Sequence, residues 1–343
     1  MDIDSLSLEE KVGQLFIVNF EGTEKTGELI HLITYFKVGG LFYRTENVSD
    51  LKKLHKLSTT VQSFAKTSLP LFLATTQEGG DVNEIAYGLT ISPSQTQLGL
   101  ANNRLYTKQM AEIVGKELRA VGVNMNFAPV LNTKNGLDDE RYFSENIDLV
   151  AKHGVAAIQG YEKAQVCAVV KYFPNIHLDN IHHTLSFQVD RKTSEMYPFY
   201  RAIKYGASGI LVTNSIFENS NSLSDTLLNE LLRERVQFDG MIITEANETT
   251  SVQSIISFIQ AGCDLIYLQT NYENQIRTIA AVLEAVKTGI ISENRINQSV
   301  KRILTVKEKH QIGEIPPFKR ERFRKKRSLD LVDRLIERAT VSN

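Results

Sequence analysis

Short β-rich apolar runs alternate with longer helical patterns along most of the 343-residue chain. The runs predict strands at 14–20, 38–44, 69–76, 123–131, 166–173, 208–217, 240–246 and 263–269. The runs are nearly continuous in apolar residues, as expected for parallel strands that are buried on both faces. The patterns between them predict helices at 50–67, 104–121, 145–164, 193–205, 224–237, 250–261, 272–288 and 292–309. Eight strand–helix units indicate a single-domain (β/α)8 TIM-like barrel, with a doubly wound open sheet as the alternative.

The charged residues place limits on the partners of the barrel. They make up 23% of the chain and nearly cancel, leaving a formal net charge of −1. Such a balance does not indicate a nucleic-acid partner for the barrel. No apolar run approaches the length of a membrane span. A protein partner is compatible with this composition but is not identified by it.

The two cysteines and the N-terminal segment bear on the compartment. Cys167 and Cys263 both lie in apolar runs, which is typical of reduced, buried thiols. No Cys or His lies near them at ligand spacing, so no metal site is expected there. Residues 1–6 are acidic and lack the basic region and apolar core of a secretory signal. These features predict a cytoplasmic protein.

The C-terminal tail departs from the alternation of strands and helices. Pro316-Pro317 interrupts the chain, and the segment 319–327 that follows is strongly basic. A short helix is predicted at 328–339. We therefore predict a barrel over 1–313 and a basic tail over 314–343. A solvated linker with a docking helix is favoured over an anion-, membrane- or nucleic-acid-binding patch, because the run has no aromatic platforms.

In such a barrel, reactive groups are expected at the carboxyl ends of the strands and in the loops that follow them. Glu245 ends the seventh predicted strand, where a carboxylate can attack an anomeric carbon. A glutamate that caps the next helix or faces solvent fits the same position. Arg141, in the loop after the fourth strand, can hold a sugar hydroxyl through its planar guanidinium. A surface charge is the commoner role of a loop arginine.

The loop after the fifth strand carries several titratable side chains, namely His177, Asp179, His182 and His183. Histidines beside an aspartate suit acid/base or metal chemistry. Adjacent His182 and His183 point in different directions in most backbones, so a joint metal site is not expected. Loop histidines without a chemical task are the commoner case.

The order of several short motifs resembles the β-N-acetylhexosaminidase branch of glycoside hydrolase family 3, from about Leu6 to Gly313. The matching segments are 8–14 (LEEKVGQ), 38–40 (VGG), 77–80 (QEGG), 115–119 (GKELR), 126–130 (NFAPV), 238–240 (FDG), 261–264 (AGCD) and 302–304 (RIL). The resemblance implies a barrel that binds a carbohydrate and hydrolyses glycosides. It implies no metal and no organic cofactor.

The resemblance also implies four substrate-binding positions. The family has Asp before its Gln-Glu-Gly-Gly motif and Arg after it, and this chain has Thr76 and Glu84 there. The two changes remove a pair of opposite charges that grips sugar hydroxyls. Arg141 and Lys171 match an Arg and a Lys of the family, although Tyr172 replaces the histidine that follows the Lys.

Both catalytic elements of the family are altered in this chain. Glu245 stands where the family has its nucleophilic Asp, and its carboxylate is one methylene further from the backbone. A displacement of a reacting group by about 1 Å can cost on the order of 100-fold in rate. The family's acid/base dyad has the spacing Asp-x-His, whereas two residues separate Asp179 from His182. These changes favour an impaired or inactive descendant, a pseudoenzyme with a retained sugar-binding or interaction role. The alternative is an active retaining β-glycosidase with Glu245 as nucleophile.

Overall fold

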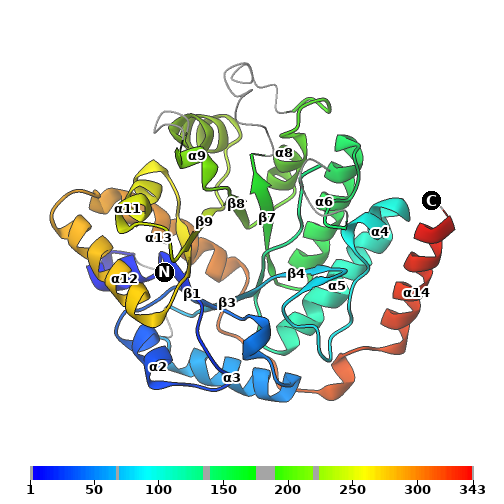
Figure 1. Ribbon diagram of the computed structural model, residues 1–343, viewed down its shortest axis with the longest axis horizontal. Helices are drawn as coiled ribbons and strands as arrows, with labels where there is room; N and C mark the ends of the chain where they lie inside the picture. Colours follow the sequence, from blue (N-terminus) through cyan, green and yellow to red (C-terminus); the bar gives the residue numbers. More distant parts are fainter. Residues whose placement is uncertain (1–2, 67–68, 134–139, 175–189, 219–223, 342–343) are drawn as a thin grey trace. The chain divides into compact units, whose positions relative to one another are not determined.

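Eight parallel strands form one closed barrel in this computed structural model, which describes residues 3–66, 69–133, 140–174, 190–218 and 224–341 (Figure 1). The order around the barrel is β1 (Phe16–Val18), β2 (Gly40–Phe42), β3 (Phe72–Thr75), β6 (Met125–Asn126), β7 (Cys167–Phe173), β8 (Gly209–Val212), β9 (Met241–Asn247) and β10 (Leu265–Gln269). Each strand lies within or largely within one of the predicted ranges. The barrel is therefore confirmed, and an open sheet is excluded.

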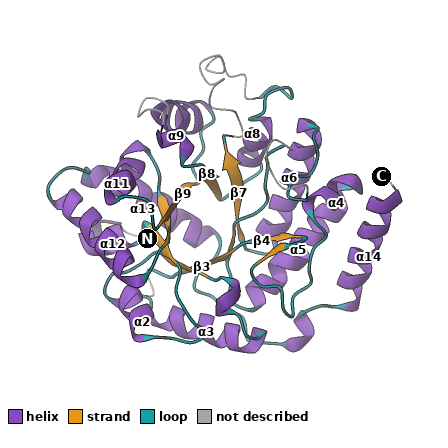
Figure 2. Ribbon diagram, in the orientation of Figure 1, coloured by secondary structure: helices purple, strands orange, loops and turns teal. Residues whose placement is uncertain are grey.

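The helices predicted between the strands are also present (Figure 2). They are α3 (Leu51–Phe64), α5 (Arg104–Ala120), α6 (Ile147–Lys163), α8 (Tyr197–Lys204), the π-type helix η4 (Thr226–Arg235), α11 (Val252–Ala261), α12 (Tyr272–Lys287) and α13 (Glu293–Lys309). Helices α3, α5, α6, α11, α12 and α13 each begin after a Ser, Asp or Asn whose side chain accepts a backbone N–H of the first turn. Such caps satisfy donors that have no partner within the helix.

Several short elements were not predicted. They are α1 (Leu8–Gly13), α2 (Gly27–Thr34), α4 (Gln95–Leu100), α9 (Ser215–Glu218), the 3-10 turns η1 (Ile3–Ser5), η2 (Thr45–Asn47) and η5 (Arg320–Arg322), and the antiparallel ribbon of β4 (Gln77–Gly79) and β5 (Val82–Asn83). The predicted helix at 328–339, by contrast, is present as α14 (Lys326–Val341). One or two turns give too few residues for a periodic pattern to stand out.

Two predicted strands are shorter than expected. The range 208–217 was wrong in its second half, because β8 ends at Val212 and α9 begins at Ser215. A short apolar run does not distinguish a strand from a helix by periodicity. In the range 123–131, only β6 pairs as a ladder, and a single further bridge joins Val130 to Lys171. Pro129 lies between them and has no N–H to donate to a ladder.

The chain divides into two compact units. The first comprises Met1–Ala74, Gly122–Asn124 and Val212–Ile315, and the second comprises Thr75–Val121, Met125–Leu211 and Pro316–Asn343. In the first unit, the fully buried Asp264 receives salt bridges from Arg233, Arg295 and Arg302. Its carboxylate also accepts the N–H of Ile242 at 2.9 Å, which fixes the start of β9.

In the second unit, α14 packs against α4 and α5 (Figure 1). Its apolar side buries Leu331 and Leu335, so the helix docks on the second unit. The backbone N–H of Arg324 donates to Glu117 Oε1 of α5 at 2.8 Å, which ties down the start of the tail. Burial raises the pKa of Glu117 above its ordinary value, against hydrogen bonds from Thr90 and Arg324 that lower it.

Both cysteines are buried and carry free thiols, as the sequence predicts.

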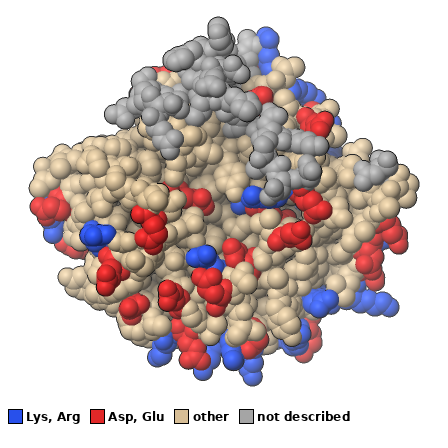
Figure 3. All heavy atoms as spheres, in the orientation of Figure 1, with Lys and Arg blue, Asp and Glu red and all other residues tan. Residues whose placement is uncertain are grey.

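Figure 3 shows acidic and basic side chains interspersed along the lower part of the face in view. Within the described ranges, no helix combines the length and the apolar character needed to cross a membrane.

Candidate active site

Glu245 lies near the carboxyl end of β9, in the first unit. It pairs in register with Tyr267 of β10, and Ala246 pairs with Leu268. Ala246 and Leu268 line a small cavity together with Ile255 of α11, so these two side chains point toward the helices. Successive side chains of a strand point to opposite faces. Glu245 and Tyr267 therefore point to the other face of the strands, the interior of the barrel.

An aromatic pair lies on the same interior face as Glu245. Tyr267 stacks on Phe42 of β2 with ring centroids 4.2 Å apart and an angle of 17° between the rings. Both rings are buried, whereas Glu245 is half-buried. Glu245 thus lies near the end of the strand that the sequence predicts, with its side chain on the interior face.

The backbone that carries Glu245 is held by Asn214, which follows β8. Asn214 Nδ2 donates to the carbonyl oxygen of Glu245 at 2.9 Å. Asn214 Oδ1 accepts a hydrogen bond of 2.6 Å from Thr244 Oγ1. Asn214 was not predicted as a site residue. In the sequence it is recognisable as an amide residue two positions after a buried apolar strand.

A buried charge cluster lies in the second unit, around Glu78 of β4. Arg141 donates to both carboxylate oxygens, from Nε at 2.9 Å and from Nη2 at 2.8 Å. Lys171 Nζ lies 2.6 Å from Glu78 Oε1, and Arg141 Nη2 also donates to the hydroxyl of Tyr172 at 2.9 Å. The structure therefore brings Arg141 and Lys171 together at one carboxylate. Sequence reasoning missed the carboxylate between them, although it lies in the Gln-Glu-Gly-Gly motif.

The charges of this cluster stabilise one another. Burial by itself raises the pKa of Glu78, but the charge of Lys171 and the charge and hydrogen bonds of Arg141 outweigh burial, so the pKa lies below its ordinary value. The hydrogen bonds from Arg141 to Glu78 in turn raise the pKa of Arg141. Glu78 is thus ionised at neutral pH, and its single charge faces two cations. The cluster keeps a net charge of +1 that can attract hydroxyl oxygens or an anionic group.

Asn132 positions the backbone beside Lys171. Asn132 Oδ1 accepts the N–H of Tyr172 at 2.6 Å, and Asn132 Nδ2 donates to the carbonyl oxygen of Tyr172 at 3.0 Å. The peptide bond between Lys171 and Tyr172 is cis. Asn132 was not predicted as a site residue either. Its position directly after the fourth predicted strand is the sequence feature that could have indicated it.

Thr76 and Glu84 lie side by side at the base of the β4–β5 ribbon. The N–H of Glu84 donates to the carbonyl oxygen of Thr76 at 3.0 Å, and both residues are half-buried. Gly79 in the ribbon has φ +101°, and a Cβ there would lie 2.4 Å from the carbonyl oxygen of Pro93. The ribbon thus requires glycine at position 79. It also holds Thr76 and Glu84 adjacent, as a pair of opposite charges at these positions would require.

Asp179 and His182 fall within 175–189 and lie outside the described residues, together with His177 and His183. The structure therefore assigns no acid/base group. In the part of the chain that the structure describes, no group of three or more His, Cys, Asp or Glu side chains is placed to hold a metal ion.

Comparisons with known proteins agree on one family. The family model described as "Glycosyl hydrolase family 3 N terminal domain" matches residues 7–306. Beta-hexosaminidase A of Pseudoalteromonas piscicida is 28% identical in a match that covers 82% of this chain but only 55% of that protein. A beta-hexosaminidase of Thioalkalivibrio sulfidiphilus is 27% identical in a match that covers 78% of this chain and 83% of that protein.

A solved structure supports the same conclusion. The family 3 beta-N-acetylglucosaminidase of Paenibacillus sp. superposes with a TM-score of 0.85 and 30% identity, over 98% of this chain and 69% of that one. The chain thus spans between about half and about four-fifths of the length of these relatives. It belongs to glycosyl hydrolase family 3 and is β-hexosaminidase-like within that family.

Proposed function

We propose that the chain is a retaining β-hexosaminidase-like glycosidase with Glu245 as its nucleophile. The observation that carries this proposal is the placement of Glu245 on the interior face near the carboxyl end of β9. A retaining glycosidase needs a carboxylate that forms a covalent bond to the anomeric carbon and is later displaced by water. Asn214 supports this role, because it fixes the backbone from which Glu245 projects.

We assign Arg141 and Lys171 to the binding of sugar hydroxyl groups. Their pairing with Glu78 holds both cations in fixed positions and spares the substrate the cost of ordering them. Thr76 and Glu84 belong to the same assignment, but they lack the opposite charges that the family uses at these positions. Sugar binding is therefore expected to be weaker than in relatives that keep the charge pair.

We assign protonation of the leaving oxygen to His182, with Asp179 as its partner. The departure from the family spacing makes this step the slow one. Substrates with a good aryl leaving group need little protonation and should be preferred over natural oligosaccharides. No metal ion and no organic cofactor takes part in this scheme.

A sugar-binding descendant without turnover is the second candidate. The Glu78 cluster favours it, because Arg141 and Lys171 are held there by contacts that do not involve Glu245. Sugar binding can therefore persist where catalysis is lost.

The test is incubation of concentrated protein with 4-nitrophenyl β-N-acetylglucosaminide and 4-nitrophenyl β-glucoside, followed by proton NMR of the sugar released. The proposal expects slow release of nitrophenol, with the β-anomer formed first. Formation of the α-anomer first would contradict a retaining mechanism. Absence of turnover with both substrates would contradict the glycosidase and support the second candidate.

A further inference from the structure

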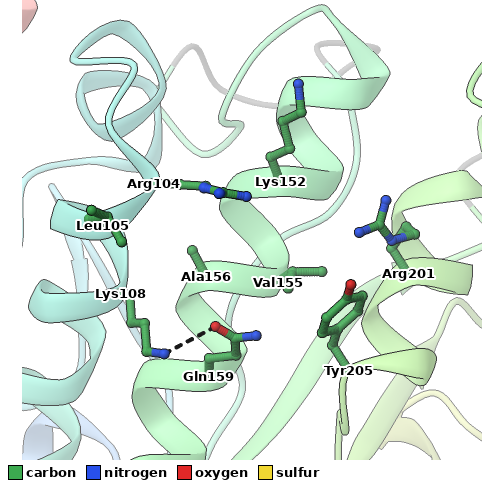
Figure 4. Close-up of a pocket in the computed structure, with 9 residues that line it drawn as sticks. All are labelled: Arg104, Leu105, Lys108, Lys152, Val155, Ala156, Gln159, Arg201 and Tyr205. Carbon is green, nitrogen blue, oxygen red and sulfur yellow. Dashed lines mark hydrogen bonds between the residues drawn. The ribbon is translucent and has the colours of Figure 1, made fainter.

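A cavity of about 280 Å³ opens on the surface of the second unit, among α5, α6 and α8 (Figure 4). Four of its nine lining residues are cationic, and none of the nine is acidic; the cations are Arg104, Lys108, Lys152 and Arg201. This concentration of one charge contrasts with the near-neutral balance of the whole chain. A concave site lined by cations attracts anions and raises their local concentration.

Three of these cations remain available to an anion. Lys152 already pairs with Asp148 at 2.7 Å, one turn away on α6. Figure 4 shows Arg104 and Lys108 extending from α5 toward α6, where Lys108 Nζ donates to Gln159 Oε1 at 3.2 Å. Since Lys108 has three donor hydrogens and Arg104 five, both can donate to a ligand as well.

Arg201 is held in place before any ligand arrives. Its Nη1 donates to the hydroxyl of Tyr197 at 2.6 Å, and its guanidinium lies over the rings of Tyr197 and Tyr205, with centroid distances of 5.6 and 5.1 Å. The hydrogen bond to Tyr197 raises the pKa of Arg201 further above its ordinary value. A fixed planar guanidinium suits two-point contact with a phosphate group.

Apart from Gln159, the rest of the lining is apolar or aromatic and offers a surface for a ring. Val155 and Ala156 of α6 form a buried floor, and Tyr205 keeps 46% of its surface exposed. The concave shape and small volume suit a small molecule. A nucleic-acid strand would instead need an extended groove with successive aromatic platforms.

We propose that this cavity binds a small sugar phosphate. The phosphate dianion would accept hydrogen bonds from Arg104, Lys108 and Arg201. The sugar ring would lie on Val155 and Tyr205. This binding site uses none of the residues assigned to glycoside hydrolysis, so it stands whether or not that function does.

The test is calorimetric titration of the full chain with glucose 6-phosphate, glucose and inorganic phosphate. Binding of glucose 6-phosphate should be at least about tenfold tighter than binding of either fragment, because each fragment lacks half of the contacts. The double variant Arg104→Gln/Arg201→Gln should lose about 100-fold in affinity, since both removed groups donate to a charged oxygen. The control variant Lys52→Gln, an exposed cation on α3, should bind like the unmodified protein.

Circular dichroism should show that the double variant is folded. Undiminished binding by the folded double variant would overturn the proposal, as would equal affinity for inorganic phosphate and the sugar phosphate. A third arm uses vesicles that contain phosphatidic acid. The vesicles could capture the protein through Arg104 and Arg201 while the free sugar phosphate does not bind. That result would assign the cavity to a lipid headgroup and would overturn the sugar-phosphate proposal.

Discussion

Lys171 Nζ lies 2.6 Å from Oε1 of Glu78, and the two side chains keep only 4% and 1% of their surface exposed. Arg141 binds the same carboxylate through two parallel hydrogen bonds. The positions of Arg141 and Lys171 therefore depend on Glu78. A change at Glu78 alters both the stability of the second unit and the placement of these two cations.

Replacement of Glu78 by Gln should destabilise the protein by about 3–5 kcal/mol, because it leaves buried cations without a counter-charge. Urea unfolding at neutral pH measures this change. Glu112→Gln is the matched control, since Glu112 also binds two lysines, Lys116 and Lys163, whose side chains are 58% and 61% exposed. That control should cost less than about 1 kcal/mol. Equal losses in the two variants would show that the Glu78 cluster is no more important than a surface pair.

The stabilising effect of Glu78 should depend on pH. Its pKa in the folded protein lies below the ordinary value of 4.5. A carboxylate with a lowered pKa contributes its full stabilisation above the unfolded-state value and loses it as the pH falls toward the folded-state value. The difference in unfolding free energy between the unmodified protein and Glu78→Gln should therefore be constant from pH 7 to about pH 5 and should shrink below about pH 4.5. A difference that grows on acidification would mean that the pKa of Glu78 is raised.

The barrel was predictable because strands buried on both faces leave continuous apolar runs in the sequence. Helix α9 was not predictable, since residues 215–218 continue such a run and a single turn has no distinguishing period. The position of Glu245 followed from the end of the seventh run. The cluster around Glu78 did not follow from spacing, because its partners Arg141 and Lys171 are separated from it by 63 and 93 residues along the chain and meet only in the folded unit.

Restoring the family's charge pair should restore sugar affinity. The variant Thr76→Asp/Glu84→Arg places opposite charges on two residues that the β4–β5 ribbon already holds adjacent. Calorimetric titration with N-acetylglucosamine should show weak binding by the unmodified protein and at least about tenfold tighter binding by the double variant. Thr76→Asp alone should gain less, because the new carboxylate would face Glu84. Equal gains from the single and the double variant would argue against a charge pair at these positions.

Helix α14 should contribute to the stability of the second unit through its buried side. Leu335 is fully buried, whereas its neighbour Ile336 is 41% exposed. Leu335→Ala should cost about 2–5 kcal/mol in urea unfolding, and Ile336→Ala should stay within about 0.5 kcal/mol of the unmodified protein. If Leu335→Ala is also neutral, the helix does not dock stably in solution.

The nucleophilic role of Glu245 is tested by the rate at which Glu245→Gln releases nitrophenol from 4-nitrophenyl β-N-acetylglucosaminide. The matched control is Glu248→Gln, which removes an exposed carboxylate three residues further along the chain. Glu245→Gln should abolish turnover, because an amide cannot form the glycosyl ester. Glu248→Gln should keep the rate of the unmodified protein. Full activity in Glu245→Gln would show that the covalent step belongs to another group and that Glu245 is not the nucleophile.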